Sequence, residues 1–165
     1  MYAVELFLTD NNQLFVNEIS PRVHNTGNHT LETTKTSQYE QHLRAITGRA
    51  LGSTARRAPV TVMRNILNVA HPLGDLASEL PHEVREGSAV LHWYGKKADR
   101  PMRKLGHITA WGNTLEEAWL AVRKVENTLC TLWSIESTSE PLLAHVTASR
   151  LNERQDHRVL QLALP

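Results

Sequence analysis

Cysteine is nearly absent from this chain of 165 residues, in which Cys130 is the only one. A single thiol can form neither an internal disulfide nor a zinc site built from several thiolates. Disulfide-stapled extracellular scaffolds and thiolate zinc modules are therefore excluded, and a reducing, cytoplasmic location is expected.

Net charge is almost lacking as well, since 18 Lys and Arg oppose 17 Asp and Glu. This balance leaves no global basic footprint for nucleic acid and no polybasic anchor for a membrane. No apolar run approaches the roughly 18 residues that cross a bilayer, and the N-terminal residues lack the features of a signal peptide. We expect neither a nucleic-acid partner nor a membrane association.

The remaining composition is typical of a packed globular protein, with 41% hydrophobic residues and four Trp. The length suits one domain or two small ones. Strand-like segments alternate irregularly with helix-like ones, so the sequence predicts an α+β fold.

The N-terminal stretch predicts a β-hairpin that carries paired carboxylates. Residues 3–9 and 14–19 are rich in β-branched and aromatic side chains and flank an Asp-Asn-Asn turn. If the two asparagines form a two-residue loop, Glu5 lies directly opposite Glu18. Like charges at this spacing repel, and Mg²⁺, which prefers hard oxygen ligands, would reverse the sign of the interaction. Two solvated carboxylates on a polar face are the alternative.

The residues after this hairpin have the composition of a binding loop. Asn17 supplies one more oxygen beside Glu18, and Arg22, His24 and Asn25 follow. A cation, an imidazole and an amide on a loop are typical of ligand binding, although the same side chains could bond only their own loop. A zinc site made by His24 and His29 is disfavoured by their spacing and by the lack of a thiolate.

A helix is predicted at residues 37–47, where Ser37 and Glu40 form a capping box and Gly48 ends the helix. Its apolar side chains share one face, which is expected to pack on a core: Tyr39, Leu43 and Ile46. Free backbone amides at its start, at Ser37 and Gln38, could hold an anion.

Residues 48–59 are predicted to connect this part to a small mixed unit. That unit is expected to contain strands at residues 60–67, 88–94 and 106–111 and helices at residues 73–80 and 113–129. The predicted division is therefore residues 1–52, residues 58–129, and a tail of residues 130–165 with no predicted role.

Five positive charges fall within residues 96–104 and are opposed only by Asp99. The run lies between two predicted strands and opens with Tyr-Gly-Lys, whose glycine permits a close approach. These features favour a phosphate grip, with a solvated basic loop as the alternative.

Several blocks of the sequence carry a family resemblance. VNEISPRVHNTG at residues 16–27 resembles the NE-x-x-PR-x-HN-S/T-G segment of the 5-(carboxyamino)imidazole ribonucleotide synthetase family, ATP-grasp ligases of purine biosynthesis. Similar blocks follow the family's order: AVELF at 3–7, TSQYEQHLRAITG at 36–48, HWYGKKADRP at 92–101 and RKLGH at 103–107. The resemblance covers about residues 2–126. It implies the C-terminal part of an ATP-grasp domain and a small, mostly antiparallel C-terminal subdomain.

The resemblance also implies an activity, in which ATP and bicarbonate are used to carboxylate aminoimidazole ribonucleotide. The complete enzyme would hold two magnesium ions and form a homodimer. The implied roles are metal binding for Glu5 and Glu18, ATP binding for Asn17 and Glu18, catalysis for Arg22 and His24, and substrate binding for Asn25, Lys96 and Arg103, the last two at the 5′-phosphate.

One position departs from the family pattern. The chain has RPMRKLGH where the family usually shows RPGRKMGH, so Met102 replaces a glycine. If that position requires a positive φ, the loop is strained here.

In the family, the adenine pocket, the glycine-rich phosphate loop and the ATP-binding lysines precede the block that matches AVELF. We therefore expect Met1 to be an internal methionine or the edge of a truncation, and we expect these 165 residues alone neither to turn over ATP nor to bind it tightly. Three alternatives remain: a catalytically inactive interaction module, part of a related ATP-grasp transformylase or carboxylase, and a metal-dependent hydrolase that uses the carboxylates and His24.

Overall fold

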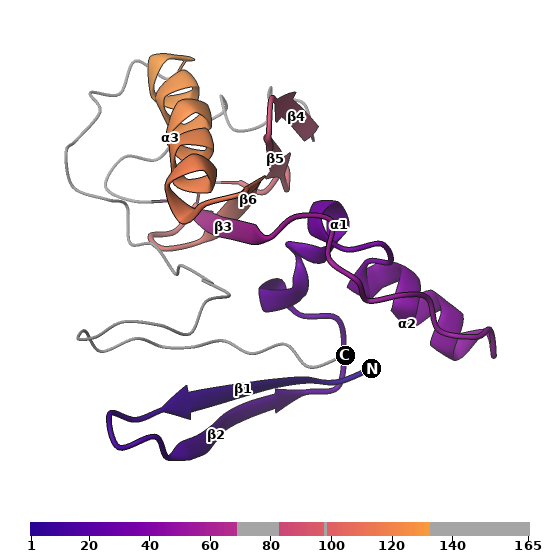
Figure 1. Cartoon of the computed structure of the whole chain (residues 1–165). Coiled ribbons are helices and arrows are strands. Elements are labelled where there is room, and N and C mark those ends of the chain that lie inside the picture. The colour runs from indigo at the N-terminus through magenta and orange to yellow at the C-terminus, as the bar shows by residue number, and fades with distance from the viewer. Residues whose placement is uncertain (69–82, 98, 133–165) are drawn as a thin grey trace. The chain divides into compact units, whose positions relative to one another are not determined.

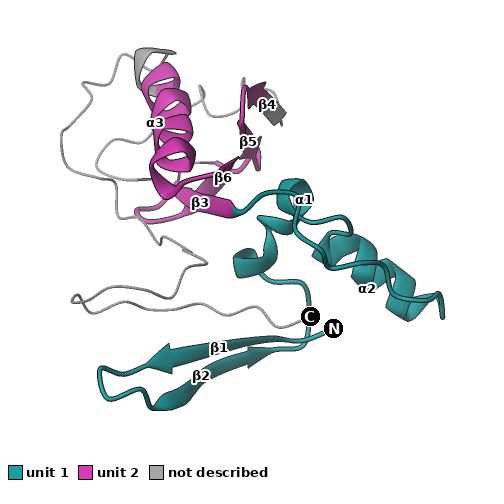
Figure 2. Cartoon of the chain, viewed as in Figure 1, with its two compact units in different colours: residues 1–59, 147–165 teal, residues 60–146 magenta. Residues whose placement is uncertain are grey.

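The structure is a computed structural model that describes residues 1–68, 83–97 and 99–132. The chain divides into two compact units, one built on residues 1–59 and the other on residues 60–146 (Figures 1 and 2). Each unit combines helices with antiparallel strands, which confirms the α+β prediction. The domain limits expected from the sequence remain predictions, and the predicted helix at 73–80 and nearly all of the tail lie outside the described residues.

The first unit begins with the predicted hairpin, made of β1 (Ala3–Leu8) and β2 (Leu14–Ser20). Its loop has three residues rather than two, because the Thr9 amide donates to the Gln13 carbonyl oxygen at 2.9 Å. Asn12, the last loop residue, has a φ of 60°. A three-residue hairpin loop that ends in a left-handed residue is a common alternative to the two-residue turn, and asparagine adopts that conformation more readily than most residues.

Glu5 nevertheless pairs with Glu18, as predicted, because a second irregularity corrects the register. Near the turn, Leu6 pairs with Val16, and the register then shifts by one residue before Glu5. Asn17 is the extra residue of this β-bulge. The bulge adds one residue to β2 and so offsets the longer loop.

The segment after the hairpin, predicted to be a loop over residues 20–36, contains two short helical turns, η1 (Asn25–Gly27) and α1 (Thr30–Thr33). Threonine hydroxyls close these turns by donating to backbone carbonyls, from Thr30 to Gly27 at 2.6 Å and from Thr34 to Thr30 at 2.9 Å. Side-chain bonds of this kind give the backbone partners that composition alone does not reveal.

Helix α2 (Gln38–Ile46) confirms the helix predicted at 37–47, with Ser37 as its N-cap. The Ser37 hydroxyl accepts from the Glu40 amide at 3.2 Å, but the Glu40 carboxylate bonds Arg44 instead of closing a capping box. The backbone amide of Gln38 donates to the Thr30 hydroxyl at 2.9 Å. This amide is therefore not available to bind an anion at the start of α2.

The expectation that the apolar face of α2 packs on a core is wrong in this structure. Leu43 is 58% exposed and Ile46 is 65% exposed. Residues 1–59 bury mostly small polar side chains, and Ala58 is the one hydrophobic residue of this range that is buried.

The second unit is a four-stranded antiparallel sheet covered by one long helix. The sheet order is β3-β6-β5-β4, with β3 (Val60–Leu67), β4 (Glu83–Glu86), β5 (Ala89–Trp93) and β6 (Lys104–Gly112). The strands predicted at 60–67, 88–94 and 106–111 are confirmed, whereas β4 was not predicted. Its four residues, Glu-Val-Arg-Glu, carry too little apolar pattern to indicate a strand.

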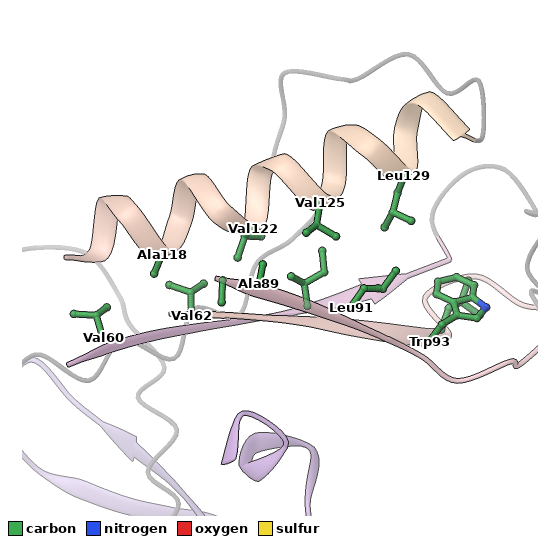
Figure 3. Packing of buried hydrophobic residues seen from close by; sticks show 12 residues of the cluster. Val60, Val62, Ala89, Leu91, Trp93, Ala118, Val122, Val125 and Leu129 are labelled. Carbon is green, nitrogen blue, oxygen red and sulfur yellow. The ribbon is translucent and has the colours of Figure 1, made fainter. Parts of the chain in front are cut away.

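Helix α3 (Leu115–Leu132) confirms the last predicted helix and packs its apolar stripe on the sheet. Figure 3 shows the helical side chains pointing at the strands, and the cluster comprises Val60, Val62, Ala89, Leu91, Trp93, Leu105, Ile108, Ala110, Ala118, Val122, Val125 and Leu129. Spacings of three and four residues put the helical members on one side of α3. This cluster is the hydrophobic core of the second unit.

A buried ion pair joins the same two layers. Arg64 of β3 is 2% exposed, and its Nε lies 2.6 Å from Oε1 of Glu126 on α3. The guanidinium also lies 5.5 Å from the ring centre of Trp119. Burial raises the pKa of the Glu126 carboxyl, while the Arg64 charge opposes that shift. Among the described residues, no helix is both long and apolar enough to cross a membrane.

Candidate metal and substrate site

The hairpin and the loop after it bring together three side chains that could hold a metal ion. Glu5, Glu18 and His24 each present one ligand atom, and these atoms lie within 4.8 Å of one another. The His24 Nδ1 is 3.5 Å from Oε1 of Glu5, and its Nε2 is 3.3 Å from Oε1 of Glu18. The paired register of β1 and β2 accounts for the carboxylates, and the bend at Pro21 and Arg22, directly after β2, leads to the imidazole.

The β-bulge adds an amide to this cluster. In a regular strand Asn17 and Glu18 would point to opposite faces, but two residues of a bulge oppose one residue of the partner strand. The Asn17 Nδ2 accordingly donates to Oε2 of Glu5 at 3.1 Å. Because an amide carries both a donor and an acceptor, a half-turn of the side chain would offer its oxygen to a cation.

The alternative of two solvated carboxylates fails for Glu5, whose side chain is 14% exposed, and holds for Glu18, which is 51% exposed. The Ser20 hydroxyl donates to Glu18 at 3.2 Å. Donors from Asn17, Ser20 and His24 thus offset part of the repulsion between the carboxylates. Two carboxylates, one of them half exposed, form a hard-oxygen site that remains open to an incoming ligand.

The backbone of His24 is held by a single glutamine. The His24 amide donates to Oε1 of Gln38 at 3.0 Å, and Nε2 of Gln38 donates to the His24 carbonyl at 2.7 Å. A Cβ at Gly27 would lie 2.4 Å from the same Gln38 Oε1, so only glycine leaves room for this contact. The helix start of α2 therefore fixes the position of the imidazole.

The imidazole orientation is set by its neighbours. The Thr26 amide approaches Nδ1 of His24 at 3.4 Å, which leaves Nε2 as the atom that carries a proton toward Glu18. The side chain is 12% exposed. In this tautomer a neutral His24 donates a hydrogen bond from Nε2–H and offers a lone pair at Nδ1.

Arg22 and Asn25 flank the imidazole in the chain. Arg22 is exposed, and its Nη1 donates to the Val23 carbonyl at 3.0 Å. Asn25 opens the turn η1, and its carbonyl accepts from Asn28 at 3.1 Å. The structure thus brings Glu5, Asn17, Glu18 and His24 together, whereas the Arg22 guanidinium bonds a backbone carbonyl of its own loop.

Lys96 and Arg103 belong to the second unit, in the segment between β5 and β6. The Lys96 ammonium lies 4.9 Å from the ring centre of Tyr94, and Nη1 of Arg103 is 2.5 Å from the Asp99 carboxylate. The bond from Arg103 lowers the pKa of Asp99 below its ordinary value. Both residues lie in a segment that could take an anion, and their binding of the 5′-phosphate remains a prediction.

Met102 has a φ of 60°, so the position where the family usually has glycine does require the left-handed conformation. Its amide donates to the Asn68 carbonyl at 2.7 Å, and the Asn68 amide donates to the Arg103 carbonyl at 2.9 Å. These two bonds hold the loop in place while Met102 bears the strain.

Sequence reasoning missed several residues that position the site: Ser20, Thr26, Gln38, Asn68 and His107. Each acts through a hydrogen bond, to a residue two positions away for Ser20 and Thr26 and to a residue distant in the sequence for the other three. All but Asn68 lie inside the blocks that carry the family resemblance, which is the signal that could have pointed to them.

Two family models match the chain. The model of the ATP-grasp domain matches residues 1–39, and that of the phosphoribosylaminoimidazole carboxylase C-terminal domain matches residues 61–119. The first match contains the carboxylate cluster, and the second contains Lys96 and Arg103.

Curated relatives agree with these models. A chloroplastic phosphoribosylaminoimidazole carboxylase of Vigna aconitifolia is 41% identical over 120 residues, which are 70% of this chain and 21% of that protein. N5-carboxyaminoimidazole ribonucleotide synthase of Mycobacterium tuberculosis is 44% identical over 117 residues, which are 70% of this chain and 27% of that protein. The chain thus spans about a quarter of the length of these relatives.

Solved structures show the same fold. The phosphoribosylaminoimidazole carboxylase ATPase subunit of Aquifex aeolicus matches with a TM-score of 0.59 and 39% identity over 76% of this chain and 39% of that one. N5-carboxyaminoimidazole synthase of Aspergillus clavatus, solved with ADP and 5-aminoimidazole ribonucleotide, matches with a TM-score of 0.61 and 31% identity over 79% of this chain and 35% of that one. From its two model matches, its relatives and its fold, the chain belongs to the family of N5-carboxyaminoimidazole ribonucleotide synthases.

Proposed function

We propose that the chain forms the metal- and substrate-binding C-terminal part of a ligase that uses ATP and bicarbonate to carboxylate 5-aminoimidazole ribonucleotide in purine biosynthesis. The observation that carries this proposal is the convergence of Glu5, Glu18 and His24 within the residues that match the ATP-grasp domain. A cytoplasmic location and a homodimer of the complete enzyme are part of the proposal.

Magnesium fits the donor set at this cluster. Glu5 and Glu18 would hold the ion, or two ions in the complete enzyme, and Asn17 would assist through its amide oxygen. When bound, magnesium neutralises charge on the β- and γ-phosphates of ATP, which is the main requirement of phosphoryl transfer. The half-exposed Glu18 side chain is the group that can also turn toward the nucleotide.

His24 and Arg22 would act on the group that is transferred. In the proposed reaction, the γ-phosphoryl group of ATP passes to bicarbonate, which gives carboxyphosphate and releases ADP. The amine of the ribonucleotide then attacks the carboxyl carbon, the bond from that carbon to the phosphate oxygen breaks, and phosphate and the amine proton leave. His24 would orient the transferred group through a hydrogen bond from Nε2–H, and the Arg22 guanidinium can pair with a carboxylate through two parallel hydrogen bonds. Asn25 would help to fix the substrate beside the imidazole.

Lys96 and Arg103 would bind the 5′-phosphate of the ribonucleotide. Their support is the exposed loop that carries both cations and the crystal structure of the Aspergillus clavatus relative with 5-aminoimidazole ribonucleotide. Arg103 would exchange the Asp99 carboxylate for the phosphate, which offers more acceptor oxygens and a larger charge.

A chimaera tests the proposal, because the chain spans only part of its relatives. The 165 residues would replace the matching C-terminal part of the Aquifex aeolicus protein, with which they share 39% identity. We expect ADP release that depends on both bicarbonate and 5-aminoimidazole ribonucleotide. Glu18→Gln and Lys96→Gln should each lower kcat/KM by about tenfold or more, since each removes a charge-assisted contact.

Glu40→Gln is the matched control, since Glu40 is an exposed carboxylate on α2 that the proposal does not use. Binding of Mn²⁺ to the chimaera, followed by paramagnetic broadening, gives a readout that does not depend on turnover. A folded chimaera in which Glu18→Gln changes neither Mn²⁺ binding nor ADP release would contradict the proposal.

A second candidate, a catalytically inactive interaction module, is favoured by one observation: the apolar face of α2 is exposed at Leu43 and Ile46. This candidate predicts a folded chimaera that binds Mn²⁺ poorly and shows no ADP release with any substrate combination.

A further inference from the structure

The Lys96 side chain is exposed, yet one aromatic ring constrains it. Its ammonium lies 4.9 Å from the ring centre of Tyr94, within the range of an attractive cation–π contact. Gly95 between them has a φ of 62°, which turns the chain so that residue 96 lies back over residue 94. The loop therefore has a local reason to hold the lysine in one place.

The position of Tyr94 is fixed by residues of β6. Its hydroxyl is 2.7 Å from Nδ1 of His107, and its amide donates to the Leu105 carbonyl at 2.9 Å. His107 is 2% exposed and stacks on His92 with ring centres 4.7 Å apart. A buried imidazole on the central strand β6 is a rigid anchor, because neither its backbone nor its ring can move without disturbing the sheet.

This imidazole is not a charge that would repel the lysine. Burial, with a smaller contribution from His92, lowers the pKa of His107 to about 3. His107 is therefore neutral wherever the protein would function, and its hydrogen bond to Tyr94 persists over that pH range.

We propose that Tyr94 is a positioning residue for Lys96, anchored by His107 so that the ammonium is held ready for a phosphate monoester. This inference rests on the proposed function for the identity of that ligand. A lysine on a four-carbon stem loses much rotamer freedom when it binds an anion, and a ring that restricts it beforehand reduces that loss.

The two cations assigned to the phosphate then differ in their unliganded state. Arg103 is paired with the Asp99 carboxylate, which a phosphate must displace. Lys96 rests on a neutral ring and can turn to the ligand without breaking an ion pair. Lys96 is thus the cation that meets the phosphate first.

Nuclear magnetic resonance of the full 165-residue chain tests the positioning without any ligand. The ring current of Tyr94 should move the ε-methylene protons of Lys96 upfield of those of Lys97. Tyr94→Leu should abolish this shift, and Tyr94→Phe, which keeps the ring but loses the bond to His107, should reduce it. Tyr2→Phe is the control, because Tyr2 is 67% exposed. Equal shifts for Lys96 and Lys97 in the wild type would overturn the inference.

A titration with ribose 5-phosphate, with ribose as the unphosphorylated control, measures the consequence. Tyr94→Leu should weaken binding about two- to fivefold, as expected for a lost cation–π contact. In a Lys96→Gln background the same change should have no further effect, because the tyrosine acts through the lysine.

The two proposals fail in different ways. If Lys96→Gln leaves ribose 5-phosphate binding unchanged, the phosphate assignment of the proposed function is wrong, and the ring-current measurement still decides the positioning. If Lys96→Gln weakens binding but Tyr94→Leu weakens it equally with and without Lys96, the phosphate assignment stands and the positioning role is refuted.

Discussion

The two units of this chain bury opposite kinds of side chain. Residues 1–59 bury mainly Ser, Thr, Asn and Gln, whereas the sheet and helix of the second unit bury a continuous hydrophobic cluster. Hydrogen bonds fix geometry but contribute little net stability, while apolar burial stabilises without directing single atoms. Hydrogen bonds thus position the groups around His24 in the first unit, whereas apolar burial stabilises the second unit.

The ion pairs of the two units give the sharpest test of this contrast. Arg64→Ala should destabilise the second unit by about 3 kcal/mol, because it leaves the largely buried Glu126 carboxylate with only the longer, 3.5 Å pair to Arg123. Arg44→Ala, which breaks the exposed Arg44–Glu40 pair of the first unit, should cost about 0.5 kcal/mol or less. Urea unfolding followed by far-ultraviolet circular dichroism, to which both units contribute, measures both, since all four Trp lie outside residues 1–59. Similar losses of unfolding free energy for the two variants would contradict the contrast between a buried and an exposed ion pair.

Apolar truncation should separate the units as well. Leu91→Ala removes a core side chain that is 1% exposed and should cost about 2–5 kcal/mol. Leu43→Ala removes a side chain that is 58% exposed, so we expect a change within about 0.5 kcal/mol. Thermal unfolding of the two variants gives the comparison, and a large loss for Leu43→Ala would show that the α2 face is covered in solution.

His107 should make the second unit sensitive to acid. Its folded-state pKa of about 3 lies below the unperturbed 6.5, so the unfolded chain takes up the proton first as the pH falls. As far as His107 is concerned, the free energy of unfolding is highest above about pH 6.5. It falls by up to about 1.4 kcal/mol per pH unit between pH 6.5 and 3. Urea midpoints at pH 7, 6, 5 and 4 measure this slope.

His107→Gln is the matched variant, because its amide can still bond the Tyr94 hydroxyl but does not titrate. We expect the variant to lose stability less steeply over the same pH range. An unchanged slope would mean that other groups cause the acid sensitivity.

The two non-glycine residues with a positive φ in the described part of the chain, one in each unit, provide the smallest effect. Met102→Gly should stabilise the chain by about 1 kcal/mol, since glycine adopts a φ of 60° without the clash that methionine suffers. Asn12→Gly should gain less, because asparagine tolerates that conformation. Midpoints of thermal unfolding rank the two, and a larger gain at Asn12 would contradict the assignment of strain to Met102.

Sequence reasoning succeeded where the local structure depends on one hydrophobic periodicity or on one pair of strand residues. The alternation in β3, the apolar stripe of α3 and the Glu5–Glu18 pair were all predictable, because each depends on spacing within a short segment. The Glu5–Glu18 pair came from a wrong loop, however: a three-residue turn and a bulge offset each other.

The failures have a common cause, which is structure set by contacts distant in the sequence. Thr30 and Gln38 convert a threonine-rich segment into helical turns through side-chain bonds that no local pattern encodes. Leu43 has the spacing of a core residue, yet nothing in the described first unit packs on it closely enough to bury it. The link from His107 through Tyr94 to Lys96 likewise needs the sheet register before it can be recognised.

The β-bulge at Asn17 has a consequence for how this hairpin can change in evolution. Removing that one residue would shift every later position of β2 by one and leave Glu18 opposite Glu5 in an unbroken ladder. The carboxylate pair therefore survives the deletion, and only the amide between them is lost. Position 17 is thus a place where a single-codon insertion can add a ligand to an existing site without disturbing any other strand pair.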